Sequence, residues 1–82
     1  MKNKNKFKIK EVLYFDNYRL FLTEEKEEND ILYYAYLQNI SYGIISMMFG
    51  FPKKSTKFEE FKKICLNCLD EYIQTYKEDF ED

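Results

Sequence analysis

The sequence predicts a small α+β fold, in which an antiparallel sheet of three to four strands (β-β-β-β-α order) precedes one C-terminal amphipathic helix packed on one face. Three observations favour this fold. Apolar and polar residues alternate near the start of the chain, an uncharged and strand-prone run fills the middle, and an apolar periodicity of three and four residues begins near residue 58. We expect the 82 residues to form a single domain, with residues 1–5 and 78–82 as frayed tails.

The first two predicted strands form a hairpin. At the start of Lys6–Tyr14 lysines alternate with apolar residues, which places Phe7 and Ile9 on one face and three lysines on the other. Asp16 and Asn17 tolerate left-handed backbone, so they predict the turn. The returning strand, residues 18–23, presents two alternate sets of side chains: Tyr18, Leu20 and Leu22, and Arg19, Phe21 and Thr23.

Two further strands are predicted beyond a polar loop that covers residues 24–30. Residues 31–38 are rich in aromatic and branched side chains and are apolar on both faces, which is typical of a central strand. Residues 39–43 predict a turn. Residues 44–49 predict the fourth strand, and we expect this strand to end at residues 50–52.

The segment 31–52 has no charged residue and is long enough to cross a membrane. Its polar centre, Gln38 and Asn39, together with two serines and four tyrosines, would be costly in hydrocarbon. Two buried strands joined by a polar turn therefore explain the segment better than a membrane span.

The C-terminal part of the chain predicts an amphipathic helix. Thr56 and Glu59 have the spacing of a capping box, in which each side chain bonds the backbone amide of the other. The apolar stripe that follows recurs at helical spacing: Phe58, Phe61, Cys65, Cys68, Leu69, Tyr72 and Tyr76. We expect this helix to run to about Lys77, because the acidic residues beyond it oppose the helix dipole.

The residues needed for common catalytic and metal sites are absent from the sequence. It has no histidine, and Gly43 and Gly50 are its only glycines, so it has neither a histidine base nor a glycine-rich phosphate loop. Cys65 and Cys68 form a C-x-x-C motif inside the predicted helix, where we interpret them as small core residues. A redox role, or a zinc site completed by a second copy, is the alternative. We expect no enzyme activity, no cofactor and no metal.

Charge is divided unequally along the chain. Five lysines lie within residues 1–10, whereas residues 11–82 carry 8 basic and 15 acidic side chains, a net charge of −7. An acidic body repels a phosphate backbone, so nucleic acid is not the expected primary partner. Lysine, asparagine, isoleucine and tyrosine have A/T-rich codons, which indicates a bacterium or a mobile element. The sequence has two cysteines, and no apolar segment follows its N-terminal lysines. Both features indicate the reducing cytoplasm.

The predicted function follows from an excess of apolar surface. One helix covers one face of a sheet, yet the third and fourth strands are apolar on both faces, so a second protein surface is expected on the other face. Tyrosine and methionine are favoured in interface cores. The candidate partner-binding residues are the tyrosines, the acidic segment and the lysine run: Tyr18, Tyr34, Tyr36, Glu24, Glu25, Glu27, Glu28, Asp30, Lys6, Lys8 and Lys10.

Two functions fit these observations. The first is a small inhibitor or adaptor that docks on and blocks a larger host or phage protein, of the anti-CRISPR, anti-defence or immunity-protein type. The alternative is a homodimeric regulatory or structural protein whose lysine-rich strand face contacts nucleic acid.

Overall fold

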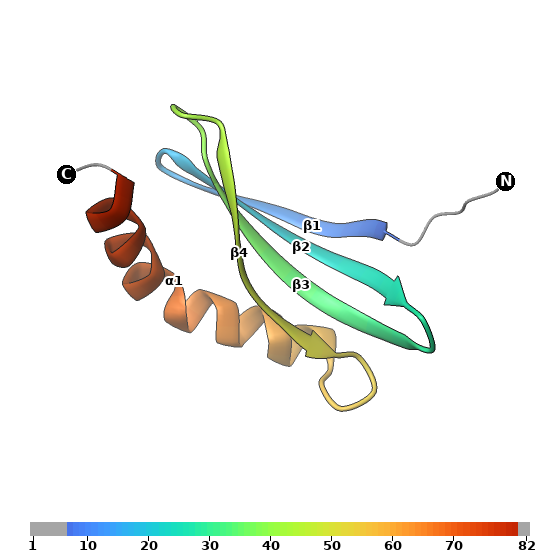
Figure 1. Cartoon of the computed structure of the whole chain (residues 1–82). Helices are drawn as coiled ribbons and strands as arrows, with labels where there is room; N and C mark the ends of the chain where they lie inside the picture. The colour runs from blue at the N-terminus through green and yellow to red at the C-terminus, as the bar shows by residue number, and fades with distance from the viewer. Residues whose placement is uncertain (1–6, 81–82) are drawn as a thin grey trace, which may run out of the picture.

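The chain folds as a four-stranded antiparallel meander followed by one long helix (Figure 1). The computed structural model describes residues 7–80. The elements are β1 (Phe7–Phe15), β2 (Tyr18–Glu27), β3 (Asp30–Asn39), β4 (Ile44–Pro52) and α1 (Phe58–Phe80). The strands lie in the sheet in sequence order, so β1 and β4 are its edges. The predicted α+β fold is confirmed.

The structure extends two strands beyond their predicted ends. Residues 24–27, predicted to be a loop, continue β2, and only Glu28 and Asn29 form the turn, with a φ of 54° at Glu28. Pairing with β3 satisfies the backbone groups of this acidic segment, and that gain overrides the low strand propensity of glutamate. β4 likewise continues through Pro52, which lies on an edge strand, where the missing N–H costs little.

The helix α1 lies across one face of the sheet (Figure 1). Phe61, Cys65 and Leu69 recur every four residues and are buried. They form one core cluster with alternate residues of the two central strands: Tyr18, Leu20 and Leu22 of β2, and Tyr33, Ala35 and Leu37 of β3. The alternation predicted for both strands is therefore confirmed, and these residues face the helix.

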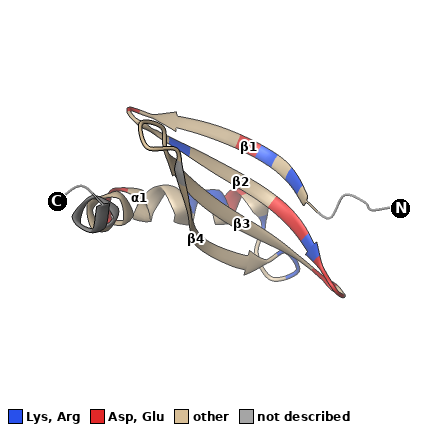
Figure 2. Cartoon of the chain, turned by 45° about the horizontal axis from the view of Figure 1, so that its top comes forward, with Lys and Arg blue, Asp and Glu red and all other residues tan. Residues whose placement is uncertain are grey.

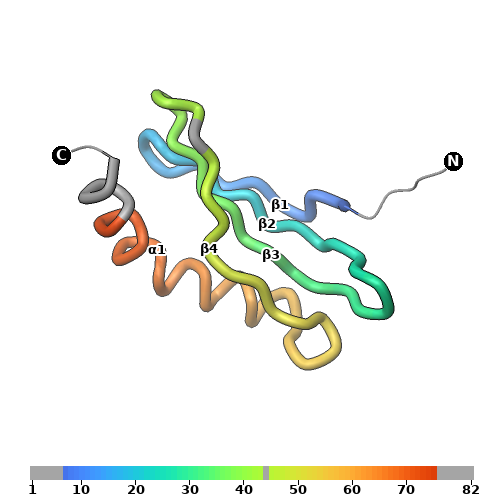
Figure 3. Tube along the Cα trace, in the orientation of Figure 1, coloured from blue at the N-terminus to red at the C-terminus, as the bar shows by residue number. Residues whose placement is uncertain are grey.

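Two β-bulges decide which face each edge strand presents. The pairing of β1 with β2 shifts between Ile9 and Glu11, so that Lys10 is the extra residue. As a result Phe7 and Ile9 point away from the helix, whereas Leu13 and Phe15 pack against the core. A second shift, in the pairing of β3 with β4, falls between Ala35 and Tyr36. Figure 3 traces the resulting curl of the sheet over the helix.

The helix begins one residue later than the capping box predicts. The backbone amide of Lys57 donates to a carboxylate oxygen of Glu60 at 3.4 Å, and the amide of Phe61 donates to the carbonyl of Lys57 at 3.0 Å. The capping contact thus joins residues 57 and 60, and not Thr56 and Glu59. The helix also continues to Phe80, three residues beyond the predicted end.

The uncharged segment 31–52 forms β3 and β4 and the turn between them, as the two-strand interpretation predicts. Within residues 7–80 no helix has both the length and the apolar character needed to span a bilayer.

Candidate functional site

The face of the sheet turned away from α1, here called the open face, is the candidate functional site. Within residues 7–80 α1 is the only helix, and it lies on the opposite face. The strand register places these residues on the open face: Phe7, Ile9, Val12 and Tyr14 of β1; Arg19, Phe21, Thr23, Glu25 and Glu27 of β2; Leu32, Tyr34, Tyr36 and Gln38 of β3; Ile45 and Met47 of β4.

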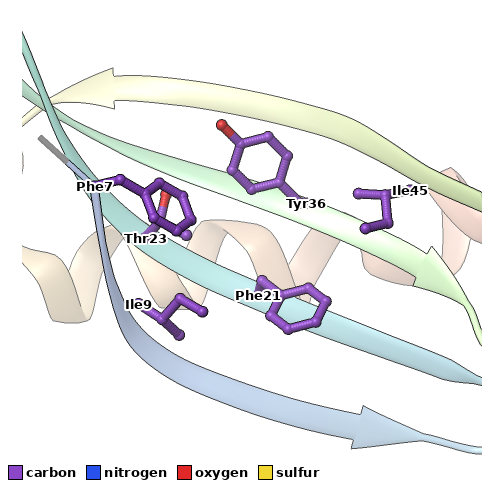
Figure 4. A pocket seen from close by; sticks show the side chains of 6 residues that line it. All are labelled: Phe7, Ile9, Phe21, Thr23, Tyr36 and Ile45. Carbon is purple, nitrogen blue, oxygen red and sulfur yellow. The ribbon is translucent and has the colours of Figure 1, made fainter. Parts of the chain in front are cut away.

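Apolar side chains on the open face surround a shallow hollow of about 340 Å³. Figure 4 shows its lining side chains in front of the sheet, with the helix behind: Phe7, Ile9, Phe21, Thr23, Tyr36 and Ile45. Thr23, which has the smallest of these side chains, is fully buried. Phe7, Ile9 and Ile45 remain 52%, 49% and 54% exposed, and Met47 beside them is 54% exposed.

Next to the hollow, two tyrosines and two glutamates form a hydrogen-bonded group that spans β2 and β3. The hydroxyl of Tyr36 donates to a carboxylate oxygen of Glu25 at 2.5 Å, and the same oxygen accepts from the hydroxyl of Thr23 at 3.0 Å. The hydroxyl of Tyr34 donates to Glu27 at 2.9 Å. This group gives one end of the open face a fixed set of carboxylates.

Burial and the neighbouring carboxylates together raise the pKa of both tyrosines. For Tyr36 the largest cause of the raised pKa is burial, followed by the hydrogen bond to Glu25. For Tyr34 the largest cause is the hydrogen bond to Glu27. A phenolate beside a carboxylate would face a like charge, so the neutral phenol is favoured. Both hydroxyls therefore act as hydrogen-bond donors at neutral pH, and neither is activated as a base or a nucleophile.

Arg19 lies at the other end of β2 on the same face. Its guanidinium is 5.7 Å from the ring centroids of both Tyr14 and Phe21, which places it on aromatic surface. None of the ion pairs among the described residues includes Arg19, Glu25 or Glu27. Figure 2 shows a basic position near the start of β2 and, near its end, acidic positions with one basic position between them.

Of the residues predicted to bind a partner, four meet on the open face: Tyr34, Tyr36, Glu25 and Glu27. Tyr18 is placed elsewhere, in the core under the helix, with 5% of its surface exposed. Glu24 also lies on the helix side of β2, where it pairs with Lys10 at 3.7 Å and with Lys53 at 3.4 Å.

The remaining predicted residues do not join this group. Lys8 pairs with Glu24 in the register of the sheet and so shares its face, and Lys10 lies over the ring of Phe58 at 5.5 Å. Lys6 lies outside the described residues. Glu28 is in the β2–β3 turn, and Asp30, which follows it, pairs with Lys54 at 3.3 Å. Lys8 therefore lies on the face opposite to Tyr34 and Tyr36.

The two cysteines have different surroundings. Cys65 is buried, and this burial raises the pKa of its thiol to about 12, which is the reverse of what a redox-active cysteine needs. Cys68 is exposed, so the interpretation as core residues is confirmed for Cys65 and wrong for Cys68. In the part of the chain that the structure describes, no three His, Cys, Asp or Glu side chains gather in a way that could hold a metal ion.

Several residues of the open face were not among the predicted binding residues: Phe7, Ile9, Phe21, Thr23, Ile45 and Met47. The signal that could have found them is the alternation itself. Once the helix occupies the face of Leu20 and Leu22, no other helix within residues 7–80 covers the apolar residues at the alternate positions. The bulge at Lys10 was needed to place Phe7 and Ile9 beside them.

Comparison of the chain with protein families, with curated proteins and with solved structures finds no match. The geometry of the open face is therefore the basis for the proposed function.

Proposed function

We propose that this protein is a non-enzymatic protein-binding module whose contact surface is the open face of its sheet. The observation that carries the proposal is the group of exposed apolar side chains, which includes Phe7, Ile9, Ile45 and Met47, on the face that the helix does not cover. A contiguous apolar patch with a polar border is typical of protein interaction sites.

A protein partner fits the hollow better than a small ligand. A small-molecule site usually encloses its ligand and fixes it with several converging polar groups. Here the hollow is shallow, and its hydroxyls, on Thr23 and Tyr36, already donate to Glu25. What remains for a partner is apolar contact in the centre and carboxylates at one end, which suits an apolar side chain next to a cation.

Two forms of this function follow from the sequence. In the first the module is an inhibitor or adaptor, of the anti-defence or immunity type, that blocks a larger protein. In the second it is a homodimer. The placement of Arg19 at one end of the face and of Glu25 and Glu27 at the other favours the second, because such a surface is complementary to itself.

The experiment is site-specific photo-cross-linking in the cells that make the protein. Ile45 is replaced by the photoreactive residue benzoylphenylalanine, and Asn67, exposed on α1, is replaced in a matched control. We expect protein adducts at position 45 in several-fold higher yield than at position 67, and their loss when Met47→Asp is added. Equal yields at the two positions, or none at position 45, would refute the proposal.

A further inference from the structure

We propose that the occupant of the open face is a second copy of this chain, packed face to face with its strands reversed. The inference rests on the proposed function, the open face as a protein contact surface, and it adds the identity and the orientation of the partner. Three features of the face favour this partner: the charges along β2, the hollow and the size of the face.

The charges on the open face are separated along one strand. Arg19 lies near the start of β2, and Glu25 and Glu27 lie six and eight residues later, which is about 20–26 Å away at 3.3 Å per residue. Among residues 7–80 none of the ion pairs includes Arg19, Glu25 or Glu27, so each end of β2 offers charge to a second molecule.

Only one two-fold arrangement of two such faces brings the opposite charges of the two copies together. In this arrangement the two-fold axis lies in the plane between the two sheets and runs perpendicular to the strands. It reverses the strand direction of the second copy, so that Arg19 of each copy faces Glu25 and Glu27 of the other. An axis parallel to the strands would instead place Arg19 against Arg19. A two-fold interface is isologous, so the favourable contact occurs twice.

The same axis fits the apolar part of the face. If Arg19 is opposite Glu25 of the second copy, the axis crosses β2 at Leu22, and Phe21 is then opposite Thr23 of that copy. Phe21 and Thr23 both line the hollow, so the ring of Phe21 in each copy would lie against the hollow of the other. The exposed side chains of Phe7 and Ile45 flank this centre.

The size of the face is sufficient for a specific dimer. Strands of 9 to 10 residues are about 30 Å long, and four strands are about 19 Å wide, which gives roughly 570 Å² for each copy. Two copies bury about 1,100 Å², just above the roughly 1,000 Å² expected of a specific interface.

The test is molar mass in solution by light scattering on a sizing column, with the fold checked by circular dichroism. Wild-type protein is expected at twice its 10.1 kDa chain mass. Arg19→Glu alone, and Glu25→Arg with Glu27→Arg, place like charges together at both contacts and are expected to weaken the dimer by more than about tenfold. Mixing the two variants restores opposite charges at both contacts, so the mixture is expected to form a dimer.

A control substitution, Lys63→Glu on the exposed side of α1, changes the net charge as Arg19→Glu does and should leave the dimer intact. Should the double substitution unfold, Glu27→Arg alone repeats the mixing experiment with the contacts of Glu25 preserved. A wild-type monomer, a dimer insensitive to Arg19→Glu, or a mixture that stays monomeric would overturn the inference. A monomer that cross-links from position 45 to a different protein would overturn it too, while leaving the proposed function in place.

Discussion

Replacing Phe61 by alanine tests whether α1 covers the core face and so leaves the other face open. The Phe61 side chain is fully buried. Its ring stacks on Tyr33 with centroids 5.5 Å apart and meets Phe51 edge-on at 5.8 Å. Truncation of a buried phenylalanine costs about 3–5 kcal/mol. A domain of this length has a free energy of unfolding of about 4–12 kcal/mol, so Phe61→Ala should remove a large part of it.

The assay is urea unfolding followed by far-ultraviolet circular dichroism, with Leu66→Ala as the matched control. Leu66 is on the same helix, but 39% of its surface is exposed, so its truncation should cost less than about 1 kcal/mol. If Phe61→Ala were no more destabilising than Leu66→Ala, the helix would not pack on the face described, and the assignment of the open face would fail.

Three further predictions concern the site and the thiols. Gly50→Ala should displace the ring of Tyr34, because the new Cβ would lie 2.5 Å from its Cε1. The hydrogen bond to Glu27 would then be lost, and the pKa of Tyr34 should fall toward 10.0; an unchanged pKa in a tyrosine titration followed by NMR would contradict this. The free energy of unfolding should fall as pH rises above 9. Cys65 has a raised pKa in the folded state and ionises first in the unfolded chain, with Tyr34 and Tyr36 adding above pH 10. A urea midpoint that stays constant from pH 8 to about pH 11 would refute this linkage. Iodoacetamide should alkylate one cysteine in native protein and two in urea, as mass spectrometry would show; rapid modification of Cys65 in the native protein would show that it is not buried.

Local periodicity predicted most of the fold. Tyr18, Leu20 and Leu22 alternate with Arg19 and Phe21, and the structure places the two sets on opposite faces. The helical stripe from Phe58 was recognised because it is sustained over several turns. Such patterns depend on residues close together in sequence, which is why the sequence alone is sufficient to find them.

Features set by pairing between distant residues were not predictable in the same way. The glutamates at 24–27 have low strand propensity, and only their pairing with β3 makes them part of β2. The bulge at Lys10 has no signature in the sequence, yet it decides that Phe7 and Ile9 join the open face. The acidic segment stays a candidate for partner binding, and the division of its members between two faces required the register.

The most direct test of the central claim, that a second copy buries the open face, is the accessibility of methyl groups to a soluble paramagnetic agent. The agent broadens the NMR signals of methyl groups that it can approach. In the associated protein we predict protected methyl groups at Ile45 and Met47, and a broadened signal from Leu66 on α1. A dimer in which Ile45 and Met47 remain broadened, or in which Leu66 becomes protected, would contradict the account.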